Sequence, residues 1–163
     1  MGTFAVQLAK NYGAEVTAVC STHNIEIVRS IGADHIFDYT KENIFTDGRQ
    51  YDLVLVVNGN RSLFAFRRIM APQGILVMVG GSLTQIFNLM FFGWLHSMSG
   101  KKMRLLSAKP NAVDLEFMIK LVEDGKLKPV IDKIYSLEET AEAMRYLNQG
   151  HARGKVLIAI NHA

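Results

Sequence analysis

The chain has 163 residues, of which 49% are hydrophobic and 20% are charged, an ordinary composition for one globular domain with a substantial core. Its formal net charge is +3, with 18 lysines and arginines spread along the chain, so the composition gives no case for a nucleic-acid partner. Its one cysteine, Cys20, excludes an intrachain disulfide and suits a reducing compartment.

No targeting or membrane segment is expected. Met1 leads directly into an amphipathic helical pattern, which argues against a signal peptide. The most apolar window, residues 83–98, contains polar side chains and is shorter than the roughly 20 residues that a membrane helix needs. We therefore expect a cytoplasmic protein without a membrane partner.

The first twenty residues predict a helix, a tight turn and a buried strand. Apolar residues recur at helical spacing up to Gly13, which is placed to end the helix. Residues 16–20 are mostly apolar, as expected of a central parallel strand covered by helices on both faces, with Cys20 in the core. This is the pattern of a nucleotide-binding β-α-β unit. Only Gly2 precedes the helix, so the first strand and the earlier glycines of the phosphate-binding turn are absent.

The following segment predicts a helix and two strands. Thr22 is the expected N-cap of a helix that ends at Gly32. Residues 35–38 predict a short strand. Residues 52–57 form a nearly continuous apolar run, which is typical of a fully buried strand.

Residues 61–70 predict the next helix, and the proline and glycine in residues 71–74 predict a turn. Residues 75–79 predict a strand that ends at Gly80 and Gly81.

The third quarter of the chain begins with the apolar patch at residues 83–98, which we interpret as core or interface rather than as part of a cofactor site. Residues 102–107 predict an edge strand. Residues 111–124 predict a helix with one apolar face that stops at Gly125.

The tail predicts a strand at residues 129–135, a capping box at residues 136–139 that opens a helix to Gln149, and a last strand at residues 155–160. Short connections between alternating helices and strands favour an α/β fold with a doubly wound, open parallel sheet.

Five sequence blocks stand in order along almost the whole chain: GTFAVQLAKNYGAEVTAVCST, RSIGADHIFDYTKE, YDLVLVVNGN, APQGILVMVGG and GKLKPVIDKIYSLEETAEAMRYLNQGHARGKVLI. Together they resemble the medium-chain dehydrogenase/reductases, in the zinc-binding alcohol dehydrogenase-like branch that includes quinone oxidoreductases. The resemblance implies a Rossmann-like fold that lacks its first strand, as in a C-terminal fragment cut at a domain boundary.

The resemblance also implies a domain plan and an activity. Residues 1–128 would be a truncated NAD(P)-binding domain, and residues 129–163 a tail that packs on an absent GroES-like catalytic domain. The whole protein would be an NADP-dependent oxidoreductase that transfers hydride, whereas this fragment alone would be inactive. The alternative is a non-enzymatic Rossmann-like module for assembly. A methyltransferase-like domain is disfavoured because its second strand usually ends in an acidic residue.

The resemblance places the cofactor at turns that follow strands. The hydroxyl groups after the second family strand would accept a 2′-phosphate where an acidic residue would hold the ribose of NAD, so NADPH is preferred over NADH. The residues implied to bind it are Gly2, Ser21, Thr22, His23, Tyr39, Asn58, Gly59, Gly80 and Gly81.

Each of these residues also has a purely structural interpretation. Ser21 and Thr22 could simply cap a helix, Tyr39 could pack at a strand end, and the glycines could serve ordinary turns. His23 stands where relatives carry lysine, so a neutral imidazole would weaken phosphate binding. No catalytic set emerges from the sequence. The five scattered histidines and one cysteine do not suggest a zinc site in this chain, and the zinc status of the longer protein stays open.

The missing first strand would lie between residues 16–20 and 52–57. Its loss would leave unpaired backbone groups, so we expect residues 155–160 to fill the gap, either by folding back or by exchange with a second copy. A homo-oligomer is therefore expected.

Overall fold

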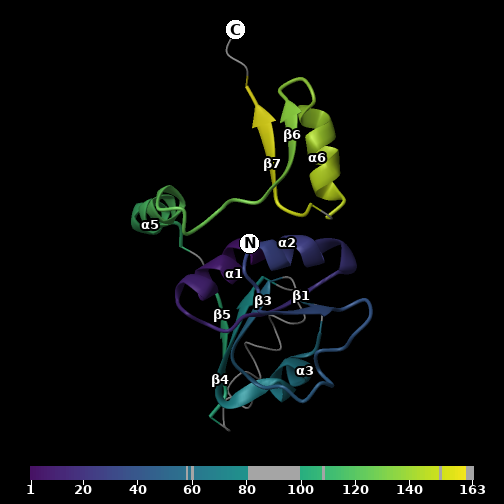
Figure 1. Ribbon diagram of the computed structural model, residues 1–163, viewed down its shortest axis with the longest axis vertical. Coiled ribbons are helices and arrows are strands. Elements are labelled where there is room, and N and C mark those ends of the chain that lie inside the picture. Colours follow the sequence, from purple (N-terminus) through teal and green to yellow (C-terminus); the bar gives the residue numbers. More distant parts are fainter. Residues whose placement is uncertain (58, 60, 81–99, 108, 151, 161–163) are drawn as a thin grey trace. The chain divides into compact units, whose positions relative to one another are not determined.

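The computed structural model describes residues 1–57, 59, 61–80, 100–107, 109–150 and 152–160. The chain divides into two compact units, one made of Met1–Ile36 and Ala112–Ala163 and the other of Phe37–Asn111. Figure 1 shows the helices and strands of both units. The predicted division into residues 1–128 and a tail that packs on another domain is not tested by these two units, and it stays a prediction.

The first unit begins with α1 (Gly2–Asn11), which ends where predicted, since Gly13 adopts the left-handed φ of 77°. After it, β1 (Thr17–Cys20) and β2 (His35–Asp38) form a two-stranded sheet. The prediction that the first of these strands is covered on both faces is wrong, because Val19 is 48% exposed.

The connection between these two strands differs from the predicted helix at its start. A 3₁₀ turn, η1 (Thr22–Asn24), comes first and is followed by α2 (Ile25–Ser30). The N-cap positions are therefore Ser21 for the turn and Asn24 for the helix, and the prediction of Thr22 as the N-cap is wrong.

The remaining part of this unit holds α5 (Ala112–Glu123) and the parallel pair of β6 (Ile131–Ser136) and β7 (Lys155–Ala159). The helix α6 (Thr140–Asn148) connects these two strands in the sequence and lies beside their sheet (Figure 1). Half of the predicted capping box is formed, because the Ser136 N–H donates to Glu139 Oε2 at 2.9 Å, yet the helix itself begins only at Thr140.

The pairing of β7 with β6 also corrects the prediction that residues 155–160 fold back between β1 and the third strand of the chain. A strand with a parallel partner already has hydrogen bonds along one of its edges. The exchange of this strand with a second copy stays a prediction.

The apolar face predicted for α5 is present but is not covered in the chain described here. Leu115 is 62% exposed, and Ile119 and Val122 are also exposed.

The second unit is built on a three-stranded parallel sheet in the order β3-β4-β5. Its strands are β3 (Tyr51–Val57), β4 (Met70–Val79) and β5 (Lys102–Leu105), and α3 (Leu63–Arg68) connects the first two. The Ser62 hydroxyl caps α3 by accepting from the Ala65 N–H at 3.3 Å. The side chains that form the core share low exposure and come from β3, β4 and the α3 region: Val56, Leu63, Phe66, Ile69, Met70, Leu76 and Met78.

The predicted turn at residues 71–74 is a bulge inside β4. Tyr51 pairs with Met70 and Leu53 pairs with Ile75, so four residues of β4 lie opposite one residue of β3. Gly74 is required in this bulge, because a Cβ there would come within 2.9 Å of the Tyr51 carbonyl oxygen. The bulge lets proline and glycine interrupt the ladder without ending the strand.

The prediction that residues 52–57 are fully buried is wrong, since Leu53 is 60% exposed and Leu55 is also exposed. The reason lies in the alternation of the strand, because Val54 and Val56 face the core of the second unit and Leu53 and Leu55 therefore lie on the opposite face. Periodicity reports which positions are apolar and does not report whether the chain supplies their cover.

Three sequence features lie outside the described residues: Asn58, Gly81 and the apolar patch at residues 83–98. Within the described part of the chain, no helix has both the length and the apolar character to cross a membrane.

Candidate functional site

Gly59 and Gly80 lie at the same edge of the β3-β4-β5 sheet. Val57 of β3 pairs in parallel with Val79 of β4, so the two strands end side by side and each is followed by one of these glycines. A Cβ on Gly59 would come within 2.5 Å of Val56 Cγ1 and 3.1 Å of Phe66 Cζ, so no side chain fits there. Gly80 has open space around it but adopts φ 74°, a conformation that side chains disfavour. The carboxyl edge of parallel strands is where ligands bind in open α/β sheets.

Ser21, Thr22 and His23 form one turn at the carboxyl end of β1. Ser21 is partly buried, while Thr22 and His23 are exposed. The Ser21 hydroxyl accepts a hydrogen bond from Asn24 Nδ2 at 3.2 Å and makes no capping bond to the 3₁₀ turn. Residues 21–24 contain no carboxylate, so the polar groups of this turn suit an anion better than a hydroxyl-bearing ligand.

Tyr39 follows β2 and is exposed to solvent in a turn that its neighbours Asp38 and Thr40 form. Asp38 is buried, and its Oδ1 accepts from the Thr40 N–H at 3.0 Å and from the Thr40 hydroxyl at 2.6 Å. This turn leaves the Tyr39 side chain 61% exposed, so the packing role that the sequence allowed for Tyr39 is not observed. The sequence interpretation missed Asp38 as the residue that positions Tyr39. Its signal is an Asp followed two residues later by Thr after a strand, which predicts an Asx turn.

Gly2 is the first residue of α1 and has nothing within 4 Å of a Cβ placed on it. Its conformation and surroundings therefore do not require glycine. The implied site residues thus include two separate groups, the turn at residues 21–23 in the first unit and the sheet edge at Gly59 and Gly80 in the second.

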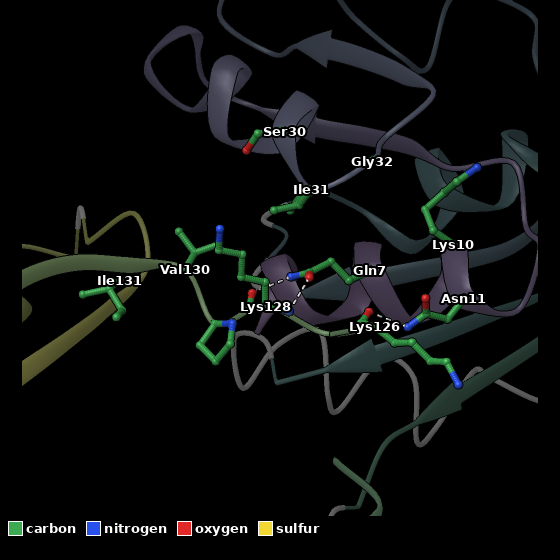
Figure 2. A pocket seen from close by; sticks show the side chains of 11 residues that line it. Gln7, Lys10, Asn11, Ser30, Ile31, Gly32, Lys126, Lys128, Val130 and Ile131 are labelled. Carbon is green, nitrogen blue, oxygen red and sulfur yellow. Dashed lines mark hydrogen bonds between the residues drawn. The ribbon is translucent and has the colours of Figure 1, made fainter. Parts of the chain in front are cut away.

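A groove of about 650 Å³ lies in the first unit, and Figure 2 shows the side chains that line it. Gln7 and Asn11 of α1 form one wall, and Lys128 and Pro129 are on the segment that faces them. None of the implied cofactor residues lines this groove.

The groove is lined by lysines that do not converge. In Figure 2 the amines of Lys10 and Lys126 point away from one another. Each is already paired with a carboxylate, Lys10 with Asp34 at 2.8 Å and Lys126 with Asp124 at 3.3 Å. The Lys10 hydrogen bond and the Val16 N–H hold the pKa of Asp34 below its usual value. Two of the three lysines are thus neutralised, and the groove is not a concentrated anion site.

A second polar cluster joins β6 to α6. Tyr146 donates from its hydroxyl to Asp132 at 2.7 Å, and the Arg153 N–H donates to the same carboxylate at 2.9 Å. Burial acts to raise the pKa of Asp132, but these two hydrogen bonds outweigh it and the pKa lies below its usual value. The same contact raises the pKa of Tyr146. Lys133 Nζ lies 4.0 Å from the centroid of the Tyr146 ring, so the cluster is a structural cation–π contact.

Across the described residues, no three His, Cys, Asp or Glu side chains form a group that could hold a metal ion. The described residues therefore do not offer a ligand set for zinc.

Both the sequence and the fold of this chain are similar to those of known proteins. Residues 31–158 match the family described as zinc-binding dehydrogenase. A chloroplast envelope quinone oxidoreductase homolog of Arabidopsis thaliana is 35% identical over 167 residues, covering 97% of this chain and 49% of that protein. A mitochondrial NAD(P)H oxidoreductase of Bos taurus is 30% identical, covering 98% of this chain and 45% of that protein.

Among solved structures, a quinone oxidoreductase from Coxiella burnetii matches with a TM-score of 0.81 and 25% identity, covering 98% of this chain and 49% of that one. The chain thus spans about half the length of the curated relatives it matches. Its fold is the Rossmann-like α/β fold with parallel sheets and flanking helices. On the match over residues 31–158, the chain belongs to the zinc-binding dehydrogenase family.

Proposed function

We propose that this chain is the cofactor-binding portion of an NAD(P)H-dependent oxidoreductase of the alcohol dehydrogenase and quinone reductase type. Family membership and the names of the relatives support this proposal. The observation that carries it is the edge at which β3 and β4 end together in Gly59 and Gly80. The carboxyl edge of parallel strands is where ligands bind in open α/β sheets, and at this edge the space beside Gly80 is open.

NADPH is the proposed cofactor in preference to NADH. A 2′-phosphate needs hydrogen-bond donors, and the turn after β1 offers the hydroxyls of Ser21 and Thr22 with no carboxylate beside them.

The nicotinamide ring supplies the hydride chemistry when it is bound, and the task of this chain is to bind and orient it. Ser21, Thr22 and His23 would hold the phosphate end, and Tyr39 would lie against the adenosine. Gly59 and Gly80 would line the cofactor where β3 and β4 end. We propose that the chain binds cofactor but does not turn over substrate alone, because it spans about half of the length of its relatives.

A titration of the chain with NADPH, followed by nicotinamide fluorescence, tests this function. We expect saturable enhancement with NADPH and weaker binding of NADH, and Ser21→Ala should weaken NADPH more than NADH. Ser30→Ala is the matched control, because Ser30 is a serine of the same unit whose hydroxyl bonds the Ile27 carbonyl. Absence of binding up to millimolar NADPH would contradict the proposal.

A non-enzymatic assembly module is the second candidate, and the uncovered apolar side chains of α5 favour it. This second candidate includes a homo-oligomer in which two copies of the chain exchange β7. An oligomeric mass by light scattering together with no response to either dinucleotide would favour this candidate. The cytoplasmic location also stays a prediction, because the relatives' names include chloroplast envelope and mitochondrial proteins.

A further inference from the structure

Asn24 is bonded to Ser21 through both its backbone and its side chain. The Asn24 N–H donates to the Ser21 carbonyl at 2.9 Å, and Asn24 Nδ2 donates to Ser21 Oγ at 3.2 Å. Both residues lie in the first unit, at the carboxyl end of β1.

This contact fixes what the Ser21 hydroxyl can offer to a ligand. A hydroxyl has one proton to donate and two lone pairs to accept with. Asn24 Nδ2 occupies one lone pair, and among the described residues the hydroxyl is not seen to donate to any acceptor, so its proton is left for a ligand. Ser21 is therefore presented as a donor, and a donor bonds a charged phosphate oxygen more strongly than a neutral ribose hydroxyl.

The rest of the Asn24 amide supports the view that these two residues act as a pair. Asn24 Oδ1 is buried and has no hydrogen-bond partner in the part of the chain that the structure describes. The amide is thus oriented by Ser21 rather than by other protein groups. If the amide were reversed, its oxygen would take the Ser21 proton and the ligand would lose the donor.

We propose that Asn24 is a positioning residue that keeps the Ser21 hydroxyl proton directed to the 2′-phosphate of NADPH, and so sets the preference for NADPH over NADH. This inference rests on the proposed function. Sequence reasoning placed Asn24 in no role, because an asparagine in such a turn is ordinary.

The test measures the dissociation constants of NADPH and NADH for the wild-type chain, Asn24→Leu, Ser21→Ala and the double variant. Asn24→Leu should weaken NADPH about threefold to tenfold, the size expected for one hydrogen bond, and leave NADH within about twofold. In the Ser21→Ala background, Asn24→Leu should have no further effect on NADPH. Asn11→Leu is the matched control, because Asn11 bonds the Lys126 carbonyl and should change neither constant.

Equal weakening of both dinucleotides by Asn24→Leu, or additive effects in the double variant, would overturn the inference while leaving the proposed function intact. No binding of NADPH by the wild-type chain would overturn both. If Asn24→Leu does not fold, Asn24→Asp gives the same test, because its carboxylate takes the Ser21 proton. It should then reduce the ratio of NADPH to NADH affinity in the wild-type background more than in Ser21→Ala, and an equal reduction in both backgrounds would overturn the inference.

Discussion

Gln7 on α1 binds the backbone of Lys128 from both sides. Gln7 Oε1 accepts from the Lys128 N–H at 2.7 Å, and Gln7 Nε2 donates to the Lys128 carbonyl at 3.0 Å. The same Nε2 also donates to the Thr3 carbonyl at 2.9 Å. The buried side-chain amide of Gln7 thus hydrogen-bonds both backbone groups of a residue that lies 121 positions further along the chain (Figure 2).

Gln7→Leu should destabilise the chain by about 1–3 kcal/mol, because it leaves the Lys128 N–H and carbonyl without these partners. Urea denaturation measures the effect. Asn11→Ala is the matched control, since Asn11 makes a single exposed hydrogen bond to the Lys126 carbonyl and should cost clearly less. Equal losses in the two variants would show that the Gln7 contact has no special importance.

Asp34 should make stability depend on pH in the acid range. Its pKa is lowered in the folded chain, first by the Lys10 hydrogen bond and next by the Val16 N–H. A lowered folded pKa means that the stabilisation is present above the unfolded pKa, about 3.9, and is lost as the pH falls through the folded value. Asp34→Asn should therefore lose less stability than the wild type between pH 7 and pH about 2. Parallel loss in the two proteins, measured as urea midpoints, would exclude this role.

The two sides of the β3-β4 pair should respond differently to substitution. Leu76→Ala should cost about 2–5 kcal/mol, because this side chain is fully buried in the core of the second unit. Leu53→Thr should change stability by at most about 0.5 kcal/mol, because Leu53 is exposed. A large loss for Leu53→Thr in dilute solution would mean that this face is covered.

Gly80→Ala should destabilise the chain by about 1–2 kcal/mol, because alanine disfavours a left-handed backbone conformation. Gly80→Asn should cost less, since asparagine adopts this conformation more readily. Gly2→Ala provides the control, because Gly2 lies in α1 without a positive φ and alanine should be neutral or stabilising there. Thermal melts that rank Gly80→Asn below Gly80→Ala would contradict the strain argument.

Much of the fold was predictable because its signals are local. The ends of α1 and α5 follow from Gly13 and Gly125, which both adopt positive φ. The apolar runs located β2, β3 and the second half of β4. Burial was predicted less well, because an apolar run such as Leu53 to Leu55 shows a preference for cover, whereas cover depends on neighbours that the local sequence does not specify.

The candidate site was predictable by position but not by interaction. The resemblance pointed to the turn at Ser21 and to the glycines after β3 and β4. The roles of Asp38 and Asn24 depend on hydrogen-bond geometry between side chains and nearby backbone, and several residue patterns give similar turns. Such contacts become visible only once the backbone conformation of the turn is known.

The most direct test of dinucleotide binding is a two-dimensional NMR titration of the isotopically labelled chain with NADPH. We expect saturable shifts of the backbone amides of Ser21, Thr22 and His23 and of Gly59 and Gly80, with smaller shifts for NADH at the first three. Shifts confined to the groove lined by Gln7 and Lys128, or no shifts up to millimolar NADPH, would contradict a cofactor site at these strand ends.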